Sequence, residues 1–174
     1  MKYFIKMAIS KSDINKALGL LLEEFKEEGK IASDVELTRQ QTDAITSILC
    51  GNDTLALLPT GAGKSWIYLF LPGVVAALRC MGYLNLPEKV VIPVISPLNA
   101  LMQDQVKTAR SLDMTATKLE DCVLSNLMQG QYTFVFGSPE SWLENKTYRD
   151  ILSCQSFYKN CVVIVVDEVH KVTW

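Results

Sequence analysis

The apolar residues in the first third of the chain recur at helical spacing. From Ile14 to Phe25 they fall three or four positions apart, a spacing that places side chains on one face of a helix. We expect Ser12 to cap this helix, Gly29 to end it, and its apolar face to pack on the domain core. A second helix is predicted from 38 to 50, because a Gly-Asn-Asp turn follows it directly.

Four short apolar runs come next, and none of them alternates with polar residues. Their side chains are mostly β-branched or aromatic, as in strands that are covered on both faces; the runs lie at 54–58, 90–95, 133–136 and 162–166. Helix-compatible segments separate them, at 64–80, 98–110, 120–128 and 139–152, and a further short strand is compatible with 114–117. The alternation predicts an α/β fold, a doubly wound parallel sheet with helices on both faces.

A glycine-rich segment joins the first of these runs to the helix after it. The segment reads Pro59-Thr60-Gly61-Ala62-Gly63-Lys64-Ser65, and we expect it to bind a nucleoside triphosphate. Glycines lack a Cβ atom, so such a loop can turn its N–H groups onto phosphate oxygens. Lys64 can reach the phosphates, and the Ser65 hydroxyl can ligate Mg²⁺. The alternative is a glycine-rich turn ahead of a core helix, and Leu58 stands where the strict motif has glycine.

Two adjacent carboxylates follow the last apolar run. Asp167 and Glu168 come directly after 162–166, where paired negative charges need a positive partner. We expect Asp167 to hold Mg²⁺ through water, and Glu168 to orient or deprotonate the attacking water. His170, the single histidine, is assigned a coupling role. The alternative is an acidic boundary between a strand and a loop.

Composition narrows the class of protein. The 174 residues are 49% hydrophobic, with a net charge of −2 and a pI near 5.5, which predicts one compact globular unit without a broadly basic surface. The five cysteines form no C-x-x-C pair, as in reduced intracellular proteins. No apolar stretch approaches the roughly 18 residues of a membrane span. We expect an intracellular protein, nuclear in a eukaryote and cytoplasmic in a bacterium, that contacts no membrane.

The chain resembles the first RecA-like lobe of the superfamily two helicases, and most closely the RecQ family of DNA helicases. The glycine-rich segment resembles motif I, and the run Ser96-Pro97-Leu98-Asn99-Ala100-Leu101-Met102-Gln103-Asp104-Gln105 resembles motif Ia in its RecQ form. Ser138-Pro139-Glu140 is similar to motif Ib, and Asp167-Glu168-Val169-His170 resembles motif II in its DExH form. The resemblance implies a P-loop NTPase fold and the division of the chain into a helical segment, 1–33, and a helicase lobe, 34–174, that ends after motif II.

The segment around Gln41 resembles the adenine-recognition motif of RecQ proteins. An amide offers a donor and an acceptor together, which matches the edge of adenine. Leu37 and Thr38 stand where the family has phenylalanine and arginine, so selectivity for ATP is left open. Two glutamines at an exposed helix start are the alternative.

The resemblance implies an ATP- and Mg²⁺-dependent DNA helicase that unwinds in the 3′-to-5′ direction and serves DNA repair and recombination. Its catalytic residues would be Lys64, Asp167, Glu168 and His170, and DNA phosphates would contact Ser96, Pro97, Asn99, Ser138 and Pro139. Ser96 could instead cap a helix, and nearby Lys107, Arg110 and Lys118 could form a solvated face. The second helicase lobe is absent from this sequence, so a nucleotide- or DNA-binding module without unwinding activity, or a related superfamily two translocase, are the alternatives.

Overall fold

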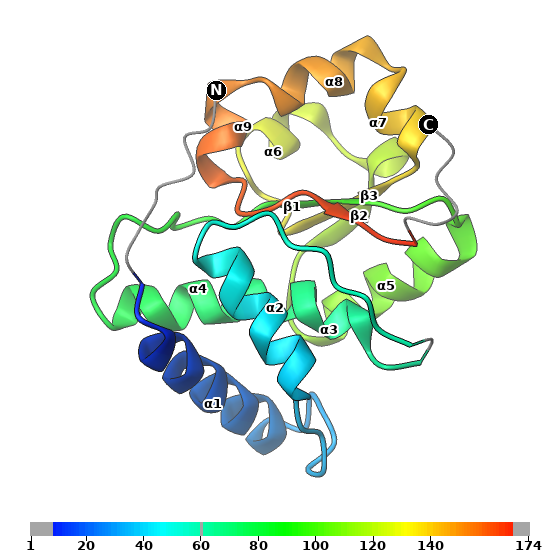
Figure 1. The fold of residues 1–174 in the computed structure, drawn as a ribbon. Helices are drawn as coiled ribbons and strands as arrows, with labels where there is room; N and C mark the ends of the chain where they lie inside the picture. The colour runs from blue at the N-terminus through cyan, green and yellow to red at the C-terminus, as the bar shows by residue number, and fades with distance from the viewer. Residues whose placement is uncertain (1–8, 60, 169–174) are drawn as a thin grey trace. The chain divides into compact units, whose positions relative to one another are not determined.

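The computed structural model describes residues 9–59 and 61–168 (Figure 1). The chain forms two compact units, Met1–Leu86 and Pro87–Trp174, which we call the helical unit and the sheet unit. The sequence predicts a single compact unit, and this prediction is wrong: the helices of the first unit pack on one another, while the strands of the second pair among themselves. The division at residue 33 stays a prediction.

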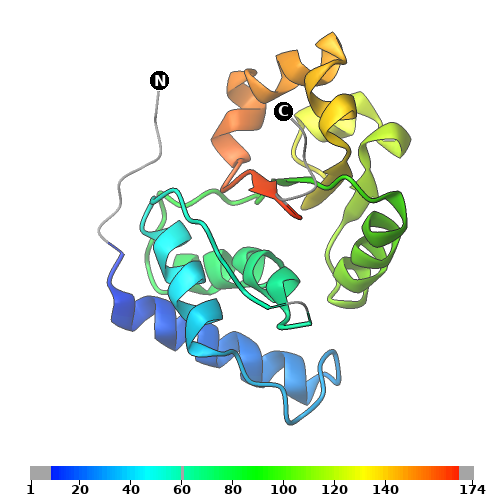
Figure 2. The ribbon, with the colours of Figure 1, turned by 45° about the vertical axis from the view of Figure 1, so that its right-hand side comes forward.

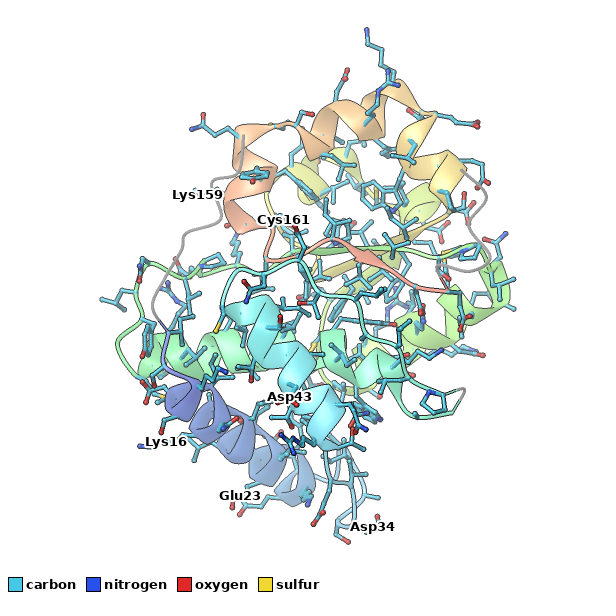
Figure 3. All side chains as sticks on the ribbon, in the orientation of Figure 1. Lys16, Glu23, Asp34, Asp43, Lys159 and Cys161 are labelled. Atoms are coloured by element: carbon cyan, nitrogen blue, oxygen red, sulfur yellow. The ribbon has the colours of Figure 1, made fainter. Side chains whose placement is uncertain are left out.

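The first helix of the helical unit is α1, Lys11–Glu27. Its N-cap is Ser10 and not the predicted Ser12, because Ser10 has the extended backbone of a cap and its hydroxyl accepts from the Asp13 N–H at 3.0 Å. Gly29 ends the helix as predicted, with a left-handed φ of 68°. The charged side chains labelled on α1 in Figure 3 point away from its apolar face.

Three further helices complete this unit: α2 (Arg39–Leu49), α3 (Lys64–Leu69) and α4 (Leu71–Cys80). The second helix is confirmed within a residue of its predicted ends. The single helix predicted over 64–80 is two helices that meet at Phe70, because Pro72 has no N–H to continue the helical hydrogen bonds. Helix α1 packs on α4. The ring centroids of Phe25 in α1 and Phe70 at the junction of α3 and α4 lie 5.7 Å apart.

The strand predicted at 54–58 does not form. These residues have no regular secondary structure, and the side chains of Leu55 and Leu57 are 73% and 83% exposed. A strand requires a neighbouring strand for its N–H and C=O groups, and residues 54–58 belong to none of the paired strands of the structure. An apolar run predicts where a strand can form but not that a partner is present.

The described part of the sheet unit contains four parallel strands: β1 (Ile92–Ile95), β2 (Ala116–Lys118), β3 (Phe134–Gly137) and β4 (Val165–Val166). Their order is β2-β3-β1-β4. This confirms the parallel α/β sheet, and β2 confirms the short strand near 114–117. Strand β4 is three residues shorter than its apolar run.

Helices cover both faces of this sheet. The chain reaches β2 from β1 through α5 (Asn99–Ser111) and returns toward β4 through a 3₁₀ turn and four short helices: η1 (Leu119–Asp121), α6 (Leu124–Met128), α7 (Pro139–Leu143), α8 (Lys146–Leu152) and α9 (Gln155–Asn160). The connection from β1 to β2 runs in one direction along the sheet, and those from β2 to β3 and from β3 to β4 run in the other, so right-handed crossovers place α5 on one face and the later helices on the opposite face. Figures 1 and 2 show α5 on one side and α6 to α9 on the other.

The core under α6 to α9 is apolar and fully buried. It contains Val91, Ile95, Leu119, Leu127, Val135, Trp142, Ile151 and Phe157. The helix predicted over 139–152 is divided into α7 and α8, because Asn145 begins α8 by accepting from the Thr147 N–H at 3.0 Å. No helix in the described ranges has the length and apolarity needed to cross a bilayer.

The pairing between β1 and β4 is interrupted opposite Pro93. Val91 pairs with Cys161 in an isolated bridge, and Ile95 pairs with Val166. Between these pairs β1 advances four residues and the outer chain advances five, so the outer chain carries one extra residue, a β-bulge. Pro93 has no N–H to donate to the outer chain, which explains why the ladder breaks there.

Candidate functional site

The loop before α3 has the backbone that the glycine-rich motif requires. Gly61 and Gly63 are both left-handed, with φ of 80° and 66°. A Cβ atom on Gly63 would lie 2.8 Å from Cδ1 of Trp66 and 2.9 Å from Nε2 of Gln41. Gly63 is therefore required by both its backbone angles and its neighbours. Thr60, predicted to bind nucleotide, lies outside the described residues.

Gln41 holds this loop in place. Its side chain is 3% exposed, and its Nε2 donates to the carbonyl oxygens of Ala62 at 3.1 Å and Gly63 at 2.9 Å. Its Oε1 accepts from the Thr38 N–H at 2.8 Å and completes a capping box at the start of α2. Both N–H donors of the amide are thus used inside the protein. The sequence alternative, an exposed glutamine, is wrong for Gln41 and right for Gln40, which is exposed.

Lys64 and Ser65 are the first two residues of α3, directly after this loop. Both are half-buried, and no side chain in the described part of the chain caps the start of the helix. Backbone N–H groups at a helix start and an ammonium bind phosphate oxygens, and a hydroxyl can ligate the Mg²⁺ that accompanies them. The chemistry of this set fits a magnesium-bound triphosphate. Pro59 is exposed at the start of the loop, and its carbonyl accepts from the Ala62 N–H at 3.2 Å.

The two carboxylates lie after β4 in the sheet unit. The Asp167 N–H donates to the carbonyl of Ile95 at 2.9 Å, so the ladder places this residue. Oδ1 of Asp167 accepts from the Glu168 N–H at 2.9 Å. Glu168 has a left-handed φ of 51°, which costs a non-glycine residue about 1–3 kcal/mol and is typical of functional sites. His170 lies outside the described residues.

Gln105 contacts this site, although the sequence did not identify it as a site residue. Its Nε2 donates to Oδ2 of Asp167 at 2.8 Å, and its side chain is 5% exposed. Within 9–59 and 61–168, its Oε1 is buried without a hydrogen-bond partner. A signal was present: Gln105 occupies the buried stripe of α5, together with Met102, Val106 and Ala109. A polar residue within the apolar stripe of a helix is therefore a candidate site residue.

The residues of the motif Ia resemblance differ in exposure. Ser96 is fully buried, its N–H donates to Gly137, and its hydroxyl has no partner within the described ranges. The alternative that Ser96 caps α5 is wrong, because Leu98 precedes this helix without a side-chain cap. Pro97 is half-buried and Asn99 is exposed. Of Ser96, Pro97 and Asn99, Asn99 alone is exposed.

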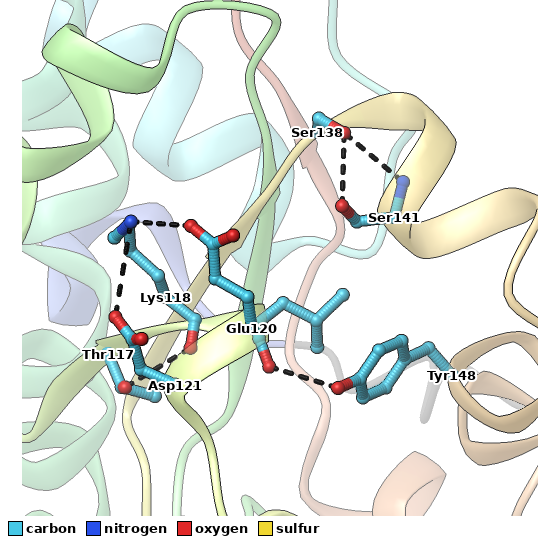
Figure 4. A network of polar contacts seen from close by, with 8 residues as sticks. Thr117, Lys118, Glu120, Asp121, Ser138, Ser141 and Tyr148 are labelled. Atoms are coloured by element: carbon cyan, nitrogen blue, oxygen red, sulfur yellow. Dashed lines mark hydrogen bonds and ion pairs between the residues drawn. The ribbon is translucent and has the colours of Figure 1, made fainter.

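Ser138 and Pro139 begin helix α7. The Ser138 hydroxyl accepts from the Ser141 N–H at 3.1 Å and lies 3.1 Å from the Ser141 hydroxyl (Figure 4), while Pro139 occupies the first turn. The Glu140 carboxyl accepts a backbone hydrogen bond at this helix start, which lowers its pKa. The hydroxyl of Ser138 is thus used as a cap, and its predicted contact with nucleic acid stays a prediction.

The basic residues near the motif Ia segment all have partners in the protein. Lys107 pairs with Asp104 at 3.4 Å, and Arg110 donates from Nε and Nη2 to the Ala116 carbonyl. Lys118 pairs with Glu120 at 2.5 Å, which raises the pKa of its ammonium (Figure 4). Lys107 and Arg110 are exposed, which supports the alternative that they form a solvated face, whereas Lys118 is half-buried.

Comparison with known proteins gives concordant matches. The sequence profile of the DEAD/DEAH box helicase family matches residues 38–173. The chain is 30% identical over 177 residues to the ATP-dependent helicase wrn-1 of Caenorhabditis elegans, covering 97% of this chain and 14% of that protein. It is 32% identical over 145 residues to the ATP-dependent DNA helicase hus2/rqh1 of Schizosaccharomyces pombe, covering 78% of this chain and 10% of that protein.

A bacterial protein matches the same region. The ATP-dependent DNA helicase RecQ of Haemophilus influenzae is 32% identical over 141 residues, covering 76% of this chain and 20% of that protein. The chain thus spans between 10% and 20% of the length of these three relatives.

Proposed function

We propose, from the premise that this chain belongs to the DEAD/DEAH box helicase family, that it is the nucleotide-binding lobe of an ATP-dependent DNA helicase of the RecQ type. Such an enzyme couples ATP hydrolysis to 3′-to-5′ unwinding with the help of a second lobe. The single observation that carries the proposal is the loop before α3, which has two left-handed glycines and is held by Gln41. Relatives that are named ATP-dependent DNA helicases support it.

The loop residues bind the phosphates of ATP in this proposal. Glycines at 61 and 63 allow the backbone to approach phosphate oxygens closely, and Pro59, Thr60 and Ala62 complete the loop. Lys64 contributes a mobile positive charge near the terminal phosphates. Ser65 contributes a hydroxyl ligand for Mg²⁺, and the metal, when bound, neutralises charge on the phosphates.

Asp167 and Glu168 divide the remaining chemistry. Asp167 would hold the metal, and its carboxylate is oriented by two hydrogen bonds. Glu168 orients the attacking water and accepts its proton. His170 links this chemistry to nucleic acid, and the described geometry of Asp167 and Glu168 is compatible with both carboxylate roles.

Gln41 reads adenine through its oxygen. Because both N–H donors of its amide are bonded to the loop, only the second lone pair of Oε1 is left for a base. An acceptor selects a base with an exocyclic amine, as in adenine, over one with an oxygen there, as in guanine. Selectivity for ATP over GTP follows from this polarity.

DNA is the proposed polymer partner, bound through its backbone by Asn99, Pro97, Ser138 and Pro139. Ser96 is fully buried in this structure and is not part of the surface that solvent reaches. We place the protein in the nucleus of a eukaryote or the cytoplasm of a bacterium, in DNA repair and recombination. Backbone contacts carry no sequence information, so binding should depend on strand state more than on sequence.

The test is DNA-stimulated ATP hydrolysis by the complete gene product and its Lys64→Ala variant. Loss of the mobile charge should lower kcat by at least about 10²-fold, since removing one group that stabilises transition-state charge costs that much in related sites. Lys16→Ala is the matched control, because Lys16 is an exposed lysine of α1 (Figure 3). Equal rates for wild type and Lys64→Ala would exclude the proposal.

A second candidate is nucleotide or DNA binding without unwinding. Unwinding of a tailed duplex by these 174 residues with ATP would exclude it. A third, a superfamily two translocase on RNA or duplex DNA, is separated from the first by comparing stimulation of ATP hydrolysis by single-stranded DNA, duplex DNA and RNA.

A further inference from the structure

We propose that Gln105 is a positioning residue that orients the Asp167 carboxylate and couples helix α5 to it. The inference rests on the proposed function, because the orientation of Asp167 affects activity through its role toward the hydrated metal. All the atoms concerned belong to the sheet unit.

The carboxylate of Asp167 is held at both oxygens. Gln105 donates to Oδ2 at 2.8 Å, and the backbone N–H of Glu168 donates to Oδ1 at 2.9 Å. Two donors on different oxygens fix the rotation of a carboxylate, which one donor does not. Hydrogen bonds to a charged acceptor are also stronger than neutral ones. Of the two donors, only the Gln105 amide is a side chain, so it can be removed by substitution.

The cost of burying Gln105 indicates a role beyond packing. Its side chain is 5% exposed, and Oε1 has no hydrogen-bond partner among the described residues. A buried oxygen in this state is unfavourable, whereas an apolar side chain of the same size would complete the stripe formed by Met102, Val106 and Ala109. The amide is present despite this cost, and the bond that it makes among the described residues is to Asp167.

Helix α5 supplies the coupling. It begins at Asn99, the exposed residue proposed to contact DNA, and Gln105 follows six residues later, about 9 Å along the axis. A helix of this length moves as a rigid body, so a displacement of its start by nucleic acid reaches Gln105 and alters the bond to Asp167. Nucleic acid would thus change the orientation of the carboxylate without contacting it.

The test compares Gln105→Met with Gln103→Met in the complete gene product. Methionine matches glutamine in length and removes the donor, and Gln103 is an exposed glutamine of the same helix. Removing a partner of a metal-holding group typically costs about 10–100-fold in activity. Gln105→Met should therefore lower kcat about tenfold or more, leave the KM for ATP within about twofold, and reduce the stimulation by DNA. Gln103→Met should retain the wild-type kcat, the KM for ATP and the stimulation by DNA.

A structural role for Gln105 would give a different pattern. Gln105→Met removes the unpartnered oxygen, so its thermal midpoint should equal or exceed that of wild type while kcat falls. A lowered midpoint with unchanged kcat would overturn the proposal. Gln105→Leu is the second variant, with the same expectations and a different apolar shape.

A readout without nucleotide separates this inference from the proposed function. In the 174-residue chain, the Glu168 amide donates to the carboxylate that Gln105 orients. Gln105→Met should speed its hydrogen exchange about tenfold relative to Gln103→Met, since one hydrogen bond to a charged group is lost. Faster exchange in a protein without ATPase activity would support the positioning role and exclude the function. Unchanged exchange would overturn the positioning role whatever the ATPase activity.

Discussion

Replacing Gln41 by leucine should release the loop before α3 from α2. The side chain is 3% exposed and makes three hydrogen bonds, to the carbonyls of Ala62 and Gly63 and from the Thr38 N–H. A net 0.5–1.5 kcal/mol for each bond gives about 1.5–4.5 kcal/mol. Water can reach the half-buried loop carbonyls after the substitution, so we expect a loss of about 2 kcal/mol in the free energy of unfolding.

Gln40→Leu is the matched control for Gln41→Leu. Gln40 precedes Gln41 on α2 and is exposed, so its replacement should change the free energy of unfolding by less than about 0.5 kcal/mol. Urea titration of the 174-residue chain gives both values. Hydrogen exchange at the Thr38 amide gives a local value, and Gln41→Leu should speed it about fivefold or more because one bond is lost.

The functional consequence follows from the position of the loop. A mobile loop must be ordered when phosphate binds, so about 2 kcal/mol of lost stability should weaken ATP binding by up to about 30-fold. Isothermal titration with Mg-ATP measures this change. If Gln41→Leu and Gln40→Leu lose equal stability and bind ATP equally, the loop is not held by Gln41 and the reasoning is refuted.

Further predictions concern other parts of the chain. Glu168→Gly should be more stable than Glu168→Gln by about 1 kcal/mol in urea titration, because glycine tolerates the φ of 51°; equal stability would contradict strain there. At pH 8, iodoacetamide should modify exposed Cys80 well before Cys161, as mass spectrometry of peptides would show, since burial raises the pKa of the Cys161 thiol to about 12. The same shift should lower stability as pH rises above about 8.5, where the unfolded chain loses a thiol proton that the folded chain keeps, and a Cys161→Ser variant should lack this loss. Gly137→Ala should lower the thermal midpoint through a cost of about 1–3 kcal/mol, because its Cβ would lie 2.7 Å from the buried indole nitrogen of Trp142. By contrast, Gly19→Ala on the exposed face of α1 should raise the free energy of unfolding by about 0.5–1 kcal/mol.

Local patterns predicted most of the helices and strands, and they failed where the outcome depended on a distant partner. Helix α1 follows from apolar spacing, the ends of α1 and α2 follow from the glycines at 29 and 51, and α5 lies within one residue of the predicted range 98–110. The run at 54–58 has an equally strong apolar pattern, yet it forms no strand, because pairing depends on a second segment. Strand β4 is shortened for the same reason, since the residue opposite its missing part is Pro93.

The residues of the candidate site also differ in whether a local pattern could predict them. The glycines and carboxylates were predictable because each motif is contiguous in the chain. Gln105 was not, because its contact with Asp167 joins positions 62 residues apart. Gln41 and Gln105 nevertheless share a signature that sequence alone provides, which is an amide within the apolar stripe of a helix.

Pro93 determines which side of the sheet the Asp167 side chain faces. Successive residues of a strand point to opposite sides, so one inserted residue inverts the parity of every residue after it. The bulge opposite Pro93 brings Val166 into line with Ile95, on the side of the core under α6 to α9, and Asp167 therefore turns toward α5. Without the bulge, the carboxylate would point into that apolar core. Pro93, within the sheet, thus determines on which side of the sheet the Asp167 side chain lies. Deletion of a single residue between 162 and 164 would move that side chain to the opposite side.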